Sequence, residues 1–134
     1  MPAVVVDTDV VSFTFKKDTR AHLYRRHLAG QTLLISFMTL AELHAWMLQR
    51  RWGLANRRLF SHHLRRYAIH YADQMLCERW AEVMNQTIMA GRPIGVAHAW
   101  IAATALVQNL PLVTHNRKDF EKVAGLKVLS ETIA

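Results

Sequence analysis

The chain has 134 residues, of which 51% are hydrophobic, so it can form one domain with a real core and is not a disordered or fibrous chain. Its apolar stretches end before the ~18 residues that a bilayer helix needs, and no secretory signal pattern opens the chain, so we expect a cytoplasmic protein with no membrane partner. The formal net charge of +7 favours a polyanionic partner, either nucleic acid or an acidic protein.

The first predicted element is a strand at Val4 to Val6, because three consecutive β-branched residues form an apolar run without alternation. It is followed by Asp7 and Asp9, which flank a threonine. Carboxylates placed after a parallel strand face the crevice where ligands bind in open α/β sheets. The alternative is that Asp7 only caps the next helix.

Further strands are predicted at residues 32–37, 68–71, 111–114 and 126–129, and amphipathic helices are predicted between them. The helix that begins near Asp73 contains Cys77, which cannot form an internal disulfide and is expected to be a small core residue. Strands that alternate with helices along the whole chain predict an α/β sandwich with a parallel sheet of four or five strands. We therefore expect residues 1–134 to form a single domain.

Glu42 follows the second predicted strand and has two interpretations. It stands three residues after Thr39, which is the spacing of a capping box, so its side chain can close back on the backbone N–H of Thr39. The functional interpretation is that Glu42, in the first turn of a helix after a strand, faces the same crevice as Asp7.

The basic residues are clustered in the first half of the chain, which favours a polyanionic partner over a merely solvated surface. The clusters are Lys16, Lys17, Arg20, Arg25 and Arg26, then Arg50, Arg51, Arg57 and Arg58, then Arg65 and Arg66. We expect specificity for the partner to lie in these helices. The histidines His62, His63 and His115 are expected at the surface or in contact with RNA.

The residues at the predicted carboxyl ends of strands and at helix starts suggest a metal site. Acidic groups predominate among them, and thiols are absent from them: Asp7, Asp9, Glu42 and Asp119, together with His98. Carboxylates suit a hard divalent cation such as Mg²⁺ or Mn²⁺, which can activate water and stabilise charge on a phosphoryl group. A basic surface around such a crevice would suit a phosphodiester substrate.

Four stretches of the sequence resemble the signature stretches of the PIN domain, and of VapC-type toxins of bacterial toxin–antitoxin pairs in particular. They occur in the family's order and span nearly the whole chain: residues 4–9 (VVVDTD), 39–43 (TLAEL), 95–106 (GVAHAWIAATAL) and 112–120 (LVTHNRKDF). The resemblance implies a three-layer fold and a Mg²⁺- or Mn²⁺-dependent endoribonuclease. It also implies a homodimer that a cognate antitoxin keeps inactive, and larger complexes with that antitoxin.

The resemblance assigns roles residue by residue. Asp7, Glu42 and Asp119 supply the acidic groups around the metal, and Thr114 and Asn116 support the acidic site. One position departs from the family pattern, because His98 stands where the family has its third acid. This removes two oxygen ligands, and imidazole is a poor partner for Mg²⁺, so we expect metal affinity and hydrolysis to be strongly reduced.

Three explanations of His98 are open: an inactivating substitution, a naturally degenerate site, or a ligand for a softer metal. The close match of the surrounding helix favours an inactivating change. Asp9 is a neighbouring carboxylate that can compensate in part if its side chain points into the site.

The main hypothesis is therefore a toxin-type ribonuclease impaired by His98, in which one carboxylate acts as general base toward water. The alternative is a non-catalytic module that binds antitoxin or RNA. A phosphoacceptor receiver domain is disfavoured, because it needs an aspartate at the end of the third strand and residues 69–72 (IHYA) supply none.

Overall fold

The computed structural model describes residues 2–132, and within them five strands form one parallel sheet in the order β3-β2-β1-β4-β5. The chain first extends the sheet from β1 to β3, then returns to the other side of β1. The strands are β1 (Ala3–Val6), β2 (Thr32–Ser36), β3 (Tyr67–His70), β4 (Leu112–Val113) and β5 (Val128–Leu129). The order of strands reverses between β1 and β4, and such switch points are where open α/β sheets bind ligands.

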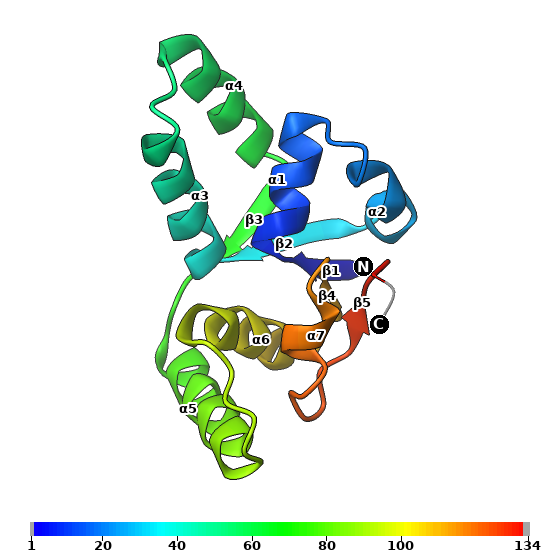
Figure 1. Cartoon of the computed structure of the whole chain (residues 1–134), viewed down its shortest axis with the longest axis vertical. Coiled ribbons are helices and arrows are strands. Elements are labelled where there is room, and N and C mark those ends of the chain that lie inside the picture. Colours follow the sequence, from blue (N-terminus) through cyan, green and yellow to red (C-terminus); the bar gives the residue numbers. More distant parts are fainter. Residues whose placement is uncertain (1, 133–134) are drawn as a thin grey trace.

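Helices cover both faces of the sheet and make a three-layer sandwich (Figure 1). One layer holds α1 (Thr8–Lys16), α2 (Ala21–Leu28), α3 (Phe37–Gln49) and α4 (Leu54–Leu64). The other layer holds α5 (Gln74–Met89), α6 (Val96–Gln108) and the short α7 (Arg117–Phe120). This arrangement and the parallel sheet confirm the predicted fold class.

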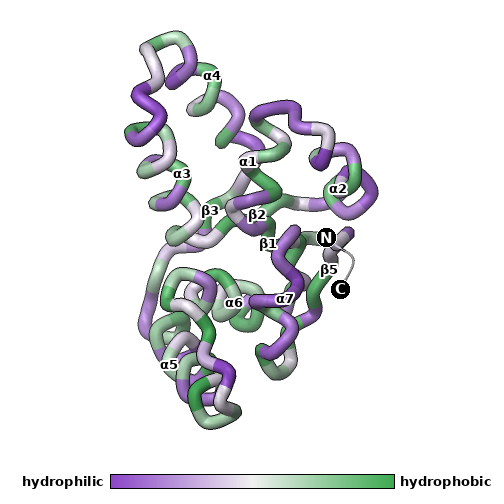
Figure 2. The backbone as a smooth tube through the Cα atoms, in the orientation of Figure 1, coloured by the Kyte–Doolittle hydropathy of each residue, from purple (hydrophilic) through white to green (hydrophobic). Residues whose placement is uncertain are grey.

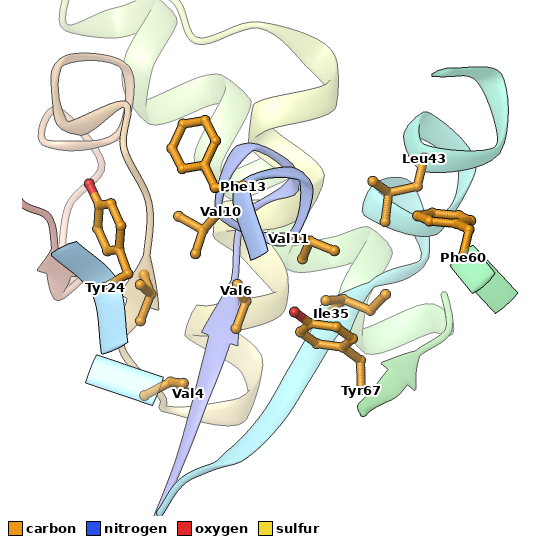
Figure 3. Close-up of a cluster of buried hydrophobic side chains, with 11 residues drawn as sticks. Val4, Val6, Val10, Val11, Phe13, Tyr24, Ile35, Leu43, Phe60 and Tyr67 are labelled. Atoms are coloured by element: carbon orange, nitrogen blue, oxygen red, sulfur yellow. The ribbon is translucent and has the colours of Figure 1, made fainter. Parts of the chain in front are cut away.

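The central strand β1 divides the core into two clusters. Val4 and Val6 pack with the α1–α4 layer, whereas Val5 packs with α5, α6 and α7. Side chains of a strand alternate between its two faces, so an unbroken valine run fills both cores. Figure 3 shows the first cluster, where Tyr24 and Phe60 reach toward β1 and β2 from opposite sides of α1.

Hydrophilic segments of the chain gather on the outer parts of the α1–α4 layer (Figure 2). All of the basic residues predicted to cluster belong to α1–α4 or to the segments that follow these helices. The sheet therefore carries one layer with a strongly basic outer surface and one without such a concentration of charge.

Three details of the sequence prediction are wrong. Cys77 is exposed rather than in the core, because α5 buries the face that contains Leu76 and Val83. Residues 117–120 form the short helix α7, which the sequence analysis did not predict. The helix α3 begins at Phe37 behind the N-cap Ser36, so Thr39 is not a cap and no capping box forms with Glu42. None of the described helices is long and apolar enough to cross a membrane.

Candidate active site

A pocket of about 330 Å³ opens at the carboxyl ends of β1 and β4, next to the switch point of the sheet. Most of its walls come from α1, α3 and α6 and from the segment after β4. Its lining residues are Asp7, Thr8, Asp9, Ser12, Glu42, Leu43, Trp46, His98 and Asn116. The fold thus brings together acidic residues that lie far apart in the sequence.

Asp7 lies at the bottom of this pocket and is buried, with 3% of its surface exposed. One carboxylate oxygen accepts a hydrogen bond from the Thr8 backbone N–H at 2.7 Å, and the other accepts one from the Thr114 hydroxyl at 2.6 Å. Asp7 is also the N-cap of α1, so the same side chain caps a helix and faces the pocket. Burial raises the pKa of Asp7, while the Thr114 hydrogen bond and the nearby His98 oppose the shift.

Glu42 is linked to Asp7 through Thr8, whose backbone N–H donates to Asp7 and whose hydroxyl faces Glu42. This hydroxyl donates to Glu42 Oε1 at 2.7 Å and lies 3.0 Å from the Thr39 hydroxyl. The side chain of Glu42 therefore points across the pocket toward α1, as the functional interpretation expected, instead of back to its own helix. Thr8 was not predicted as a site residue, although its place between two aspartates was visible in the sequence.

Asp9 lines the same pocket and accepts hydrogen bonds from the backbone N–H groups of Val10 at 2.7 Å and His115 at 3.2 Å. Burial, with the adjacent Asp7 as the second cause, raises the pKa of Asp9 to about 7. The structure thus places a second aspartate beside Asp7.

His98 and Asp119 form a contact at the edge of the pocket. His98 Nδ1 lies 3.1 Å from Asp119 Oδ2, and the same oxygen accepts a hydrogen bond from Asn116 Nδ2 at 2.9 Å. The imidazole packs against Phe120, with ring centroids 4.9 Å apart. The backbone N–H of Asn116 donates a hydrogen bond to the Thr114 hydroxyl, which itself donates to Asp7. A continuous series of hydrogen bonds therefore runs from Asp7 through Thr114 and Asn116 to Asp119.

Two of the three histidines expected at the surface, His63 and His115, are packed inside instead. His63 is buried, with its Nε2 3.1 Å from the Thr14 hydroxyl, and desolvation lowers its pKa to about 4. His115 is half-buried and its Nδ1 makes a hydrogen bond with the hydroxyl of Tyr24. Both rings are packed into the α1–α4 layer, whereas His62 is exposed as expected.

The donor chemistry of the pocket fits a hard divalent cation. Asp7, Asp9 and Glu42 offer carboxylate oxygens, and within residues 2–132 no lysine or arginine forms a salt bridge with any of them. Two buried carboxyl groups with raised pKa values form the kind of environment that a bound cation would stabilise. In the described part of the chain, however, no three His, Cys, Asp or Glu side chains are already gathered closely enough to hold a metal.

Comparison with known proteins agrees with the fold. Residues 4–126 match the PIN domain family, and the chain therefore belongs to it. Ribonuclease VapC1 of Haemophilus influenzae (strain R2866) is 29% identical over 129 residues, covering 92% of this chain and 93% of that protein.

Two solved structures share the fold over almost their whole length. VapBC2 from Rickettsia felis, bound to a DNA fragment from its promoter, superposes with a TM-score of 0.84 at 22% identity and covers 97% of this chain and 99% of the matched chain. VapBC-1 from nontypeable Haemophilus influenzae gives a TM-score of 0.80 at 26% identity, and the match covers 96% of this chain and 97% of the matched chain.

Proposed function

We propose that this PIN domain is an endoribonuclease toxin of the VapC type, which cleaves RNA phosphodiesters by attack of water and is neutralised by an antitoxin. The observation that carries the proposal is the acidic pocket at the switch point of a sheet with a basic outer layer, in which no described lysine or arginine forms a salt bridge with Asp7, Asp9 or Glu42. The similarity to a relative named as a ribonuclease supports the same reaction.

Asp7, Glu42 and Asp119 would hold Mg²⁺ or Mn²⁺, with Asp9 as an adjacent carboxylate. Bound there, the cation would activate water and offset charge on the phosphate. Thr8 and Thr114 fix the orientations of Glu42 and Asp7, and Asn116 fixes that of Asp119. A carboxylate beside the water would accept its proton.

His98 is the reason to expect an impaired enzyme. Its imidazole contributes no oxygen ligand, and it contacts the Asp119 carboxylate that the proposed metal site requires. A nitrogen donor at this position also shifts the preference of the site away from Mg²⁺ toward softer metals. The same contact supports the second candidate, a non-catalytic PIN module that binds antitoxin or RNA without cleavage.

The partners follow from the same comparisons and from the surface. Both solved relatives belong to VapBC toxin–antitoxin complexes, which supports a cognate antitoxin for this chain. A homodimer is supported by the large apolar side chains that α5 and the start of α6 leave exposed: Met75, Ile88, Met89 and Val96.

The deciding experiment compares RNA cleavage by this chain and by His98→Asp, each with Mg²⁺, with Mn²⁺ and with chelator. We expect the variant to cleave with either metal and the parent to be much slower, with chelator stopping both. The matched control is His98→Asp combined with Asp7→Asn, which should be inactive. Equal cleavage by parent and variant would make His98 a tolerated or working ligand, and absence of cleavage by both would favour the binding module.

A further inference from the structure

A groove of about 770 Å³ runs between α1, α3 and α4 on the basic layer. Its lining residues include aromatic and basic side chains and, within the described chain, no acidic one: Thr14, Phe15, Lys16, Lys17, Trp46, Arg50, Trp52, Asn56, Leu59, His62, His63 and Arg66. A groove that combines aromatic rings with cations is suited to a ligand with flat bases and negative phosphates.

Trp46 is the central residue of this groove. It is half-buried and meets Trp52 edge to face, with ring centroids 4.8 Å apart and an interplanar angle of 70°. Lys16 Nζ lies 5.4 Å and the Arg50 guanidinium carbon 5.9 Å from the centroid of the Trp46 ring. Both cations are exposed and lie over the indole ring, so a base that stacks on Trp46 has to displace at least one of them toward its flanking phosphates.

Trp46 also connects the groove to the acidic pocket, because it lines both. It stands four residues after Glu42 in α3, so the two side chains lie on the same face of the helix, one turn apart. A strand of nucleic acid in the groove would therefore enter the acidic pocket directly past the indole.

We propose that this groove holds an unpaired nucleotide next to the phosphate to be cleaved, with its base stacked on Trp46 and its flanking phosphates bound by Lys16 and Arg50. The inference rests on the proposed ribonuclease function and narrows its substrate to RNA that is single-stranded at this position. A base within a duplex cannot be splayed onto a side chain without unpairing, so paired RNA would bind only through its backbone.

The test measures binding rather than cleavage. Fluorescence anisotropy with chelator present compares a labelled oligouridine strand with a fully paired RNA duplex of equal length. We expect the parent chain to prefer the single strand and to show quenched tryptophan emission when it binds. Trp46→Leu should weaken single-strand binding by roughly 10-fold and leave duplex binding nearly unchanged, because only an unpaired base can stack on the indole.

Charge variants separate stacking from electrostatics. Lys16→Gln and Arg50→Gln should weaken the binding of both the single strand and the duplex. Each should also lower the salt dependence of binding by about one counterion. The matched control is Arg92→Gln, because Arg92 comes three residues after the end of α5, which lies at the opposite end of the molecule from α4 (Figure 1). It should change neither binding constant, and thermal unfolding of every variant verifies that the fold is intact.

Equal affinity of the parent for single strand and duplex, or binding without tryptophan quenching, would overturn the inference. So would an acidic peptide that fills the groove and leaves RNA binding unchanged, because the groove would then be a protein docking site. Absence of cleavage by both the parent and His98→Asp, with single-strand binding intact, would instead refute the nuclease proposal alone.

Discussion

The Thr8 hydroxyl donates a hydrogen bond to Glu42 Oε1 at 2.7 Å, and this contact joins the first turn of α1 to α3 across the pocket. The backbone N–H of the same threonine donates to Asp7 Oδ1, so Thr8 contacts the carboxylates of both Asp7 and Glu42 and fixes the spacing of these two acidic groups. The hydroxyl of Thr39 in α3 also contacts the Thr8 hydroxyl, and it completes a small polar cluster between α1 and α3.

Replacement of Thr8 by valine removes this hydrogen bond while keeping the shape of the side chain. We expect a loss of roughly 1–3 kcal/mol in the free energy of unfolding, since a part-buried carboxyl oxygen loses its hydrogen-bond donor. Urea denaturation measures it. Thr19→Val, at an exposed position without such a contact, is the control and should leave stability within about 0.5 kcal/mol. Equal stability of the parent and Thr8→Val would show that the contact contributes nothing.

Thr114→Val should act on Asp7 itself. The Thr114 hydroxyl is buried and donates to Asp7 Oδ2, and this hydrogen bond opposes the rise in the pKa of the carboxyl group. Without it the pKa of Asp7 should rise further, which NMR titration of the carboxyl carbon would detect. In the His98→Asp background, the acid limb of the pH–rate profile should move to higher pH. An unchanged titration would contradict the prediction.

Asp9→Asn should stabilise the protein in neutral and alkaline solution. The pKa of Asp9 is raised to about 7 in the folded state and is near 3.8 when unfolded, so the unfolded chain ionises first. Stability therefore falls as the pH rises from about 4 to 7 and stays reduced above that range. The substitution should raise the free energy of unfolding by on the order of 1–3 kcal/mol at pH 8 and should leave it unchanged below pH 4. Glu78→Gln, on the exposed face of α5, should show no such gain.

His63 should make the protein sensitive to mild acid. Its pKa is lowered to about 4 in the folded state from an unfolded value near 6.5, so the unfolded chain takes up the proton first. The contribution of neutral His63 to the free energy of unfolding is fully present above about pH 6.5. This contribution, on the order of 2 kcal/mol, is lost as the pH falls toward 4. His63→Phe should remove this part of the pH dependence, since Thr14 and Tyr67 still pair with each other at 3.2 Å.

An unchanged slope between pH 6.5 and 4 in His63→Phe, measured by urea denaturation, would contradict this explanation. His62→Phe is the matched control, because it makes the same change of side chain at an adjacent, exposed position.

The sequence predicts the structure correctly where an element or a position is determined by the residues close to it along the chain. Unbroken apolar runs mark β1 and β2 because both faces of the sheet are covered, and the acids after them are brought to one edge by the parallel arrangement. The contact of His98 with Asp119 could not be predicted, since it depends on how α6 and α7 pack. The capping box failed for a different reason: Ser36 is an equally good cap, and it comes first.

The hydrogen bond between Asp7 and Thr114 spans 107 residues of sequence. Because β1 pairs with β4, the central strand lacks one of its neighbours until the last fifth of the chain has been made. A ribosome that stops before Thr114 would release a fragment whose first aspartate has lost its hydroxyl partner. The order of synthesis thus delays assembly of the acidic pocket until almost the whole protein exists.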